Sequence, residues 1–121
     1  MEIAKFQELL ADKVIGGMIS YMDFFDEDEE CPFTKEDVAK CEKILSHYLE
    51  SLAALPCPTD KAIMDCVQRA VLALNQLNED TDYGMIETEE RENIWELIQT
   101  SAVECGLRNP ADDITEEWRE W

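Results

Sequence analysis

The amino-acid sequence predicts an all-α fold: an antiparallel up-and-down bundle of four main helices with a short C-terminal helical tail. Two observations lead to this prediction. Apolar residues recur every three or four positions in four separate segments, which is the spacing of one face of a helix. Proline, glycine and acidic stretches separate these segments, and no segment shows the two-residue alternation of a strand. The length of 121 residues is close to the commonest domain size, so we expect residues 1–121 to form a single helical bundle domain.

The first predicted helix spans residues 2 to about 25 and contains a glycine pair. Phe6, Leu10 and Tyr21 mark one apolar face. Gly16 and Gly17 lie in the middle, where each glycine costs about 0.5–1 kcal/mol relative to alanine. We expect the pair to allow close approach of a neighbouring helix or to kink the element, and a hinge is the functional alternative.

The second predicted helix follows an acidic stretch and opens with a strong start signal. Thr34 is the expected cap, and Asp37 three positions later comes close to a capping box. Pro56 ends the helix. The most regular apolar seam in the chain lies between them: Val38, Cys41, Leu45, Tyr48, Leu52 and Leu55.

The third predicted helix, residues 59–78, is the most clearly amphipathic and is expected to be the centre of the bundle. Thr59 or Asp60 can cap its first turn. Cys66, Val71 and Ala73 widen the apolar stripe, so this helix should contact more than one neighbour. The stripe itself consists of Ile63, Val67, Ala70, Leu74 and Leu77.

The fourth predicted helix begins at Thr88 as its cap and ends at Gly106, where Leu107 supplies the apolar contact of a Schellman motif. The tail that follows could begin a short fifth helix capped by Asp113. Three apolar tail residues are expected to fold back onto the bundle: Ile114, Trp118 and Trp121.

The charge of the chain is its most unusual property. There are 29 Asp and Glu against 10 Lys and Arg, a formal net charge of −19. Nucleic acid and anionic membranes would repel such a chain, so we expect neither as a partner. The field favours a basic protein partner, or serves solubility alone.

Cysteine usage and the N-terminus predict a cytoplasmic protein. The five Cys are an odd number without Cys-x-x-Cys spacing, which argues against a disulfide framework and for a reducing compartment. Residues 1–13 lack the apolar segment of a signal peptide. The longest apolar run, residues 14–22, is about half the length needed to span a bilayer.

Two acidic segments far apart in the sequence are predicted to form one acidic cap. Six of the eight residues 23–30 are acids, and residues 79–90 are also rich in acids. Short connections make neighbouring helices antiparallel, which places both segments at the same end of the bundle. The predicted partner-binding residues are Asp26, Glu27, Asp28, Glu29, Glu30, Glu79, Asp80, Asp82, Tyr83, Glu87, Glu89 and Glu90.

The same region offers an incomplete match to a calcium loop. Asn78, Asp80 and Asp82 stand at the first three ligand positions, and Glu89 stands at the twelfth. Tyr83 replaces the glycine that should make the sharp turn. A solvated acidic linker is the favoured interpretation, with divalent-metal binding as the alternative.

No catalytic or cofactor motif stands out, so we expect a non-enzymatic protein without a cofactor. His47 is the only histidine, and it belongs to neither a Glu-x-x-His pair nor a nucleophile elbow. Cys41 and Cys66 lie on predicted core faces.

The leading hypothesis is therefore an acidic binding protein that docks on a basic protein surface. In composition alone, the chain is similar to nuclease immunity proteins, antitoxins and DNA mimics, which are small acidic proteins that occlude basic surfaces. The first alternative is a structural or self-associating bundle, and the sequence leaves monomer and dimer open. The aromatics expected at the surface, where Trp and Tyr often anchor partners, are Phe33, Tyr83, Trp95, Trp118 and Trp121.

Overall fold

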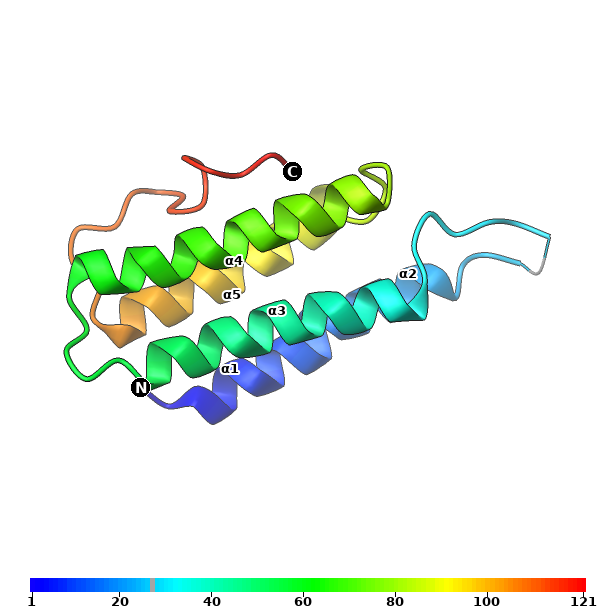
Figure 1. Ribbon diagram of the computed structural model, residues 1–121. Helices are drawn as coiled ribbons and strands as arrows, with labels where there is room; N and C mark the ends of the chain where they lie inside the picture. The colour runs from blue at the N-terminus through cyan, green and yellow to red at the C-terminus, as the bar shows by residue number, and fades with distance from the viewer. Residues whose placement is uncertain (27) are drawn as a thin grey trace.

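The computed structural model describes residues 1–26 and 28–121. The regular elements in these residues are all helical, which confirms the predicted fold class. They are α1 (Ile3–Leu9), η1 (Leu10–Ile15), α2 (Gly16–Met22), α3 (Lys35–Ala53), α4 (Asp60–Asp80) and α5 (Thr88–Cys105). Because α1, η1 and α2 follow one another without a break, they form the first of four long helical rods (Figure 1).

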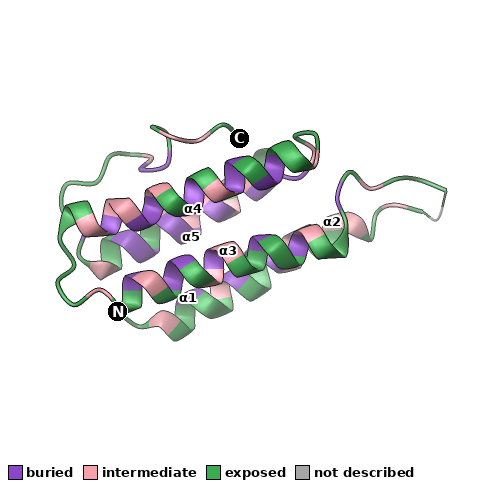
Figure 2. Ribbon diagram, in the orientation of Figure 1, coloured by how far each residue is buried: buried purple, intermediate pink, exposed green. Residues whose placement is uncertain are grey.

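The four rods run alternately up and down and pack side by side around one core (Figure 1). The first rod contacts α3 and α5, and α4 contacts the same two helices from the other side. Figure 2 shows that buried residues line the inward faces of the helices. Leu45, Ile63, Leu74, Ile94 and Leu97 are fully buried, and each stabilises the bundle by about 1.5–3 kcal/mol. None of the described helices is both long enough and apolar enough to cross a membrane.

The glycine pair does not break the first rod. Gly17 faces α5, and an added Cβ would lie at an ordinary contact distance of 3.5 Å from the side-chain nitrogen of Asn93. Because a methyl group would fit there, the neighbouring helix does not need a glycine at this position, and the prediction of a close approach is not supported. The preceding turn, η1, is a π-helix, which the apolar pattern does not predict. Such single wide turns occur within otherwise regular helices.

Most predicted helix ends are found where the sequence places them. The Thr34 hydroxyl oxygen accepts from the Asp37 N–H at 3.2 Å, and the Asp37 carboxylate accepts from the Thr34 N–H at 2.9 Å, completing a capping box. Thr59 caps α4 by accepting from the Ala62 N–H. The cap of α5 is one residue earlier than predicted, because Glu87 is the flanking residue and Thr88 is already helical.

The end of α5 is a Schellman motif, as predicted. Gly106 has a φ of 120°, a conformation that glycine adopts without strain. The Leu107 N–H donates to the Ala102 carbonyl at 3.1 Å, and the Gly106 N–H donates to the Val103 carbonyl at 3.1 Å. Leu107 is buried against the bundle.

The C-terminal tail folds back onto α4, although residues 114–118 form turns and no regular helix. The side-chain amide of Asn75 on α4 binds the tail through both its nitrogen and its oxygen. Its nitrogen donates to the Trp118 carbonyl at 2.8 Å, and its oxygen accepts from the Glu120 N–H at 3.0 Å. Ile114 is buried, and Trp118 and Trp121 pack against the core.

Candidate binding surface at the acidic end

The two acidic connections lie at the same end of the bundle and touch each other. Residues 23–34 join α2 to α3, residues 81–87 join α4 to α5, and both emerge at one end (Figure 1). The contact is close, since a methyl group added at Gly84 would come within 2.6 Å of the Pro32 Cβ. The antiparallel topology therefore brings the two connections together at their bases, the parts that adjoin the helices.

Buried residues anchor the bases of both connections. The Asn78 side-chain oxygen accepts from the Ile86 N–H at 2.9 Å, and Asn78 itself is buried. Met85 and Ile86 insert into the core. Phe33 does the same from the other connection and stacks on the Tyr21 ring at 5.7 Å between ring centres.

The electrostatic surroundings of Tyr21 show that the connections converge on α2. Desolvation raises the pKa of the Tyr21 hydroxyl, and the nearby Glu87 and Glu90 carboxylates and the Cys31 side chain raise it further. These three groups come from the two connections and the first turn of α5. Groups from both connections and from α5 therefore lie close to the Tyr21 side chain.

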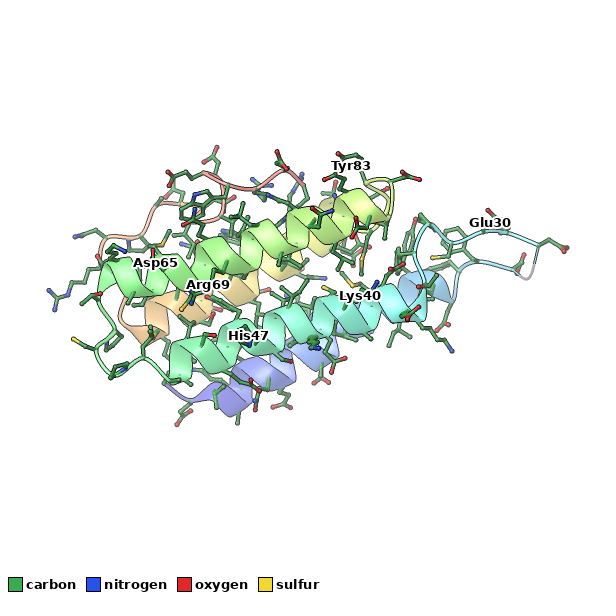
Figure 3. The ribbon with its side chains drawn as sticks, in the orientation of Figure 1. Glu30, Lys40, His47, Asp65, Arg69 and Tyr83 are labelled. Carbon is green, nitrogen blue, oxygen red and sulfur yellow. The ribbon has the colours of Figure 1, made fainter. Side chains whose placement is uncertain are left out.

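Most of the predicted surface carboxylates are exposed. Figure 3 shows Glu30 on a loop that extends beyond the ends of the helices, with Tyr83 on the neighbouring connection. The other exposed predicted acids are Asp26, Asp28, Glu29, Glu79, Asp80, Asp82, Glu87 and Glu89. Glu27 lies outside the described residues. Glu90 corrects the prediction, because it is 9% exposed and contributes little to the surface.

No ion pair between described residues neutralises this end. The pairs that the structure does show are Lys5–Glu104, Lys13–Glu96, Lys61–Asp65 and Arg119–Asp113. None of these includes a residue of the predicted surface. At physiological salt, charges act over about 8 Å, so neighbouring carboxylates of this end reinforce one another's field.

Two exposed aromatics accompany the acids. Tyr83 is 61% exposed, as the sequence predicted for this residue. Phe24 is 82% exposed. Trp95, Trp118 and Trp121 are half-buried.

The prediction of a surface position for Phe33 is wrong, since this residue is 2% exposed. A sequence signal could have placed it in the core. Phe33 immediately precedes the cap Thr34, and Val38 lies at the fourth helical position, which is the spacing of a hydrophobic staple. Both Phe33 and Val38 are buried.

The geometry does not support the calcium-loop alternative. Asn78, its proposed first ligand, is buried and accepts the Ile86 N–H instead. Asp82 and Tyr83 adopt left-handed backbone conformations, with φ of 53° and 61°, to make the turn that the missing glycine would have made. In the described part of the chain, no three His, Cys, Asp or Glu side chains converge as a metal site would require.

The cysteines that line the core are poor candidates for nucleophiles. Burial raises the pKa of the Cys41 thiol to about 12. Burial also raises the pKa of the Cys66 and Cys105 thiols. Because the thiolate is the reactive form, these three side chains are held in their unreactive state at neutral pH.

No protein-family model, curated protein or solved structure matches this chain. Any functional argument therefore starts from the surface itself. We name the exposed acids and aromatics of residues 24–30 and 79–89 the acidic end.

Proposed function

We propose that this protein is a non-enzymatic binding protein that docks its acidic end on a basic protein surface, in the manner of an immunity protein, antitoxin or DNA mimic. One observation supports this most directly. Two segments rich in exposed carboxylates leave the same end, their bases in contact, and the described residues provide no ion-pair partner there. Exposed Tyr83 and Phe24 lie in the same segments.

Each feature has a physical role in the proposed docking. The net charge of −19 attracts a basic partner over a distance and speeds encounter. Carboxylates on the two connections would accept hydrogen bonds from Arg and Lys of the partner. Tyr83 and Phe24 would supply apolar contact area, which charge pairs at a wet rim provide poorly.

The test compares two variants of equal net charge. The first neutralises four acids of the acidic end: Asp26→Asn, Asp28→Asn, Glu29→Gln and Glu30→Gln. The control neutralises four exposed acids elsewhere: Glu8→Gln, Asp12→Asn, Glu116→Gln and Glu117→Gln. Both variants lose four negative charges, so they differ in where the charge is removed and not in how much.

Immobilised wild type is used to capture proteins from a lysate of the source cell, and bound protein is eluted with rising salt. We expect a basic protein that elutes as salt increases, because salt screens the docking. The purified partner should then bind the control about as well as wild type and the first variant at least about tenfold more weakly. A partner without basic character, or equal loss in both variants, would contradict the proposal.

A further inference from the structure

A groove of about 610 Å³ runs between α3 and α4 on the outside of the bundle. Its apolar lining includes the half-buried Ile44 on α3 and Ala73 on α4, together with the buried Ala70 and Leu77 of α4. Figure 3 shows its rims: Lys40 and His47 extend from α3, and Arg69 extends from α4 on the facing side. The groove is separate from the acidic end except at Asp80, where one end of the groove meets it.

Helical periodicity explains how the two helices form this groove. On α4, Cys66, Ala70, Ala73 and Leu77 step by four, three and four, so they lie in one row at the edge of the core stripe, to which Ala70 and Leu77 also belong. The two alanines leave space that larger side chains would fill. From Lys40 to Ser51, α3 advances 11 residues, so the groove is about 17 Å long.

The groove gathers positive charge in a chain that is otherwise strongly negative. Lys40, Lys43 and Arg69 are three of the ten Lys and Arg residues in the sequence. All three are exposed, and none is within ion-pair distance of a described carboxylate. Arg69 donates to the Cys66 sulfur at 3.4 Å.

The acids of the groove are fewer than its cations and lie near its ends. Glu50 is near the C-terminal end of α3, and Asp80 is the last residue of α4. Asp80 accepts a hydrogen bond from Gln76 at 2.9 Å. The middle of the groove is therefore apolar below and cationic on both sides, with exposed His47 between Lys43 and Glu50 on the α3 rim.

We propose that this groove binds an amphipathic helix of a partner protein, with an apolar stripe flanked on both sides by acidic residues. The apolar row would receive the stripe, as in other helix-in-groove complexes. Lys40 and Lys43 would pair with acids on one flank, and Arg69 with acids on the other. A length of about 17 Å accommodates three turns of helix.

The placement of the cations decides between this occupant and two others. A fatty-acid-like molecule has one anionic head and would need its cations gathered at one end, but Lys40, Lys43 and Arg69 are spread along two rims. A second copy that docked symmetrically through the same groove would place its own Lys40, Lys43 and Arg69 against the same cations of the first. The groove proposal does not depend on the proposed function of the acidic end.

The probe is a fluorescein-labelled 16-residue peptide with Leu at helical i, i+3, i+4 and i+7 spacing and Glu on both flanks. A second peptide has Lys in place of every Glu. Binding to the full chain is measured by fluorescence anisotropy at low and physiological salt. We expect the Glu peptide to bind and salt to weaken its binding, because the rim pairs are exposed.

Three variants locate the binding. Lys43→Glu with Arg69→Glu reverses the rim charge, and Ala73→Trp fills the apolar row. Each variant should bind the Glu peptide at least about tenfold more weakly than wild type does. The matched control, Lys35→Glu with Arg108→Glu, makes the same change in net charge at exposed positions outside the groove, and should bind the peptide within about twofold of wild type. Circular dichroism verifies that each variant is folded.

Several results would overturn the proposal. One is binding of the Lys peptide as tight as, or tighter than, that of the Glu peptide. A second is an equal loss of binding in the rim variant and its control. A third is saturable binding of dodecanoate, blocked by Ala73→Trp, without binding of the Glu peptide, which would assign the groove to a single-headed amphiphile. A fourth is a wild-type dimer in sedimentation that Ala73→Trp dissolves, which would assign the groove to a second copy.

Discussion

The two connections at the acidic end differ in how they are held. Residues 81–87 leave α4 through a turn that Asn78 closes by accepting the Ile86 N–H, and Met85 and Ile86 are buried beneath it. Among the described residues of 23–34, the buried anchor is Phe33 at the base of the connection, where Pro32 also meets Gly84. The described acids of residues 26–30, which lie farther along the same connection, are exposed.

This difference separates stability from binding at one end of the molecule. The residues that fix the path of the backbone are apolar or amide side chains facing inward. The residues that would meet a partner are charged and face outward. Substitutions should therefore affect one property without the other, and the predictions below test that separation from the largest expected effect to the smallest.

Truncating the buried anchor should have the largest effect. Met85 is completely buried, so Met85→Ala should lower the free energy of unfolding by about 2–5 kcal/mol. Phe24, 82% exposed in the other connection, is the matched comparison, and Phe24→Ala should change stability by no more than about 0.5 kcal/mol. Urea denaturation followed by circular dichroism measures both. Similar losses in the two variants would show that the connections are anchored alike.

Removing the amide that closes the turn should have the next largest effect. Asn78→Ala leaves the buried Ile86 N–H without an acceptor, which should cost about 1–3 kcal/mol. The exposed neighbour Gln76 is the control, and Gln76→Ala should cost less than about 0.5 kcal/mol. Hydrogen exchange at the Ile86 amide should accelerate in the first variant alone. Unchanged exchange would mean that the amide has another acceptor.

The contact between the connections can be tested with a pair of glycine substitutions. A methyl group at Gly84 would come within 2.6 Å of Pro32 Cβ and 3.2 Å of the Thr81 carbonyl oxygen, so Gly84→Ala should destabilise by about 1–3 kcal/mol. A methyl group at Gly17 meets the Asn93 side chain at an ordinary 3.5 Å. Because this glycine is helical, Gly17→Ala should stabilise by about 0.5–1 kcal/mol. The midpoint temperature of thermal unfolding should fall for Gly84→Ala and rise for Gly17→Ala. An unchanged midpoint for Gly84→Ala would show that the two connections are not in close contact at Gly84.

The parts of the fold that sequence predicts well are those with local causes. The capping box of Thr34 and the Schellman motif of Gly106 depend on residues only a few positions apart, and both are present. Apolar periodicity predicts the helices for the same reason. It does not predict the π-helical turn at η1, because one wide turn scarcely changes the apolar spacing.

The candidate sites depend on contacts between distant residues, and sequence predicts them less well. Antiparallel packing predicts that the two acidic segments share an end. It does not predict that Glu90 is buried there or that Asn78 is used inside the turn. The groove was not predicted, because Lys40 and Arg69 become the two rims of one groove only when α3 and α4 pack together. The available sequence signal was the widening of the apolar stripe of α4 by Cys66 and Ala73, both of which line the groove.

Neutralising the exposed acids should have the smallest effect on stability. Any change should be a gain in stability, whereas truncating the buried anchors causes a loss. Asp28→Asn, Glu29→Gln and Glu30→Gln remove like charges that no described cation pairs with, so the variant should be equal to wild type or more stable by less than about 0.5 kcal/mol. Repulsion between exposed charges is screened within about 3 Å at 1 M salt, so any gain should vanish there. Urea denaturation at 10 mM and 1 M sodium chloride measures both values. A loss of more than about 1 kcal/mol at low salt would exceed what exposed, unpaired charges contribute and would place these acids among the anchors of the fold.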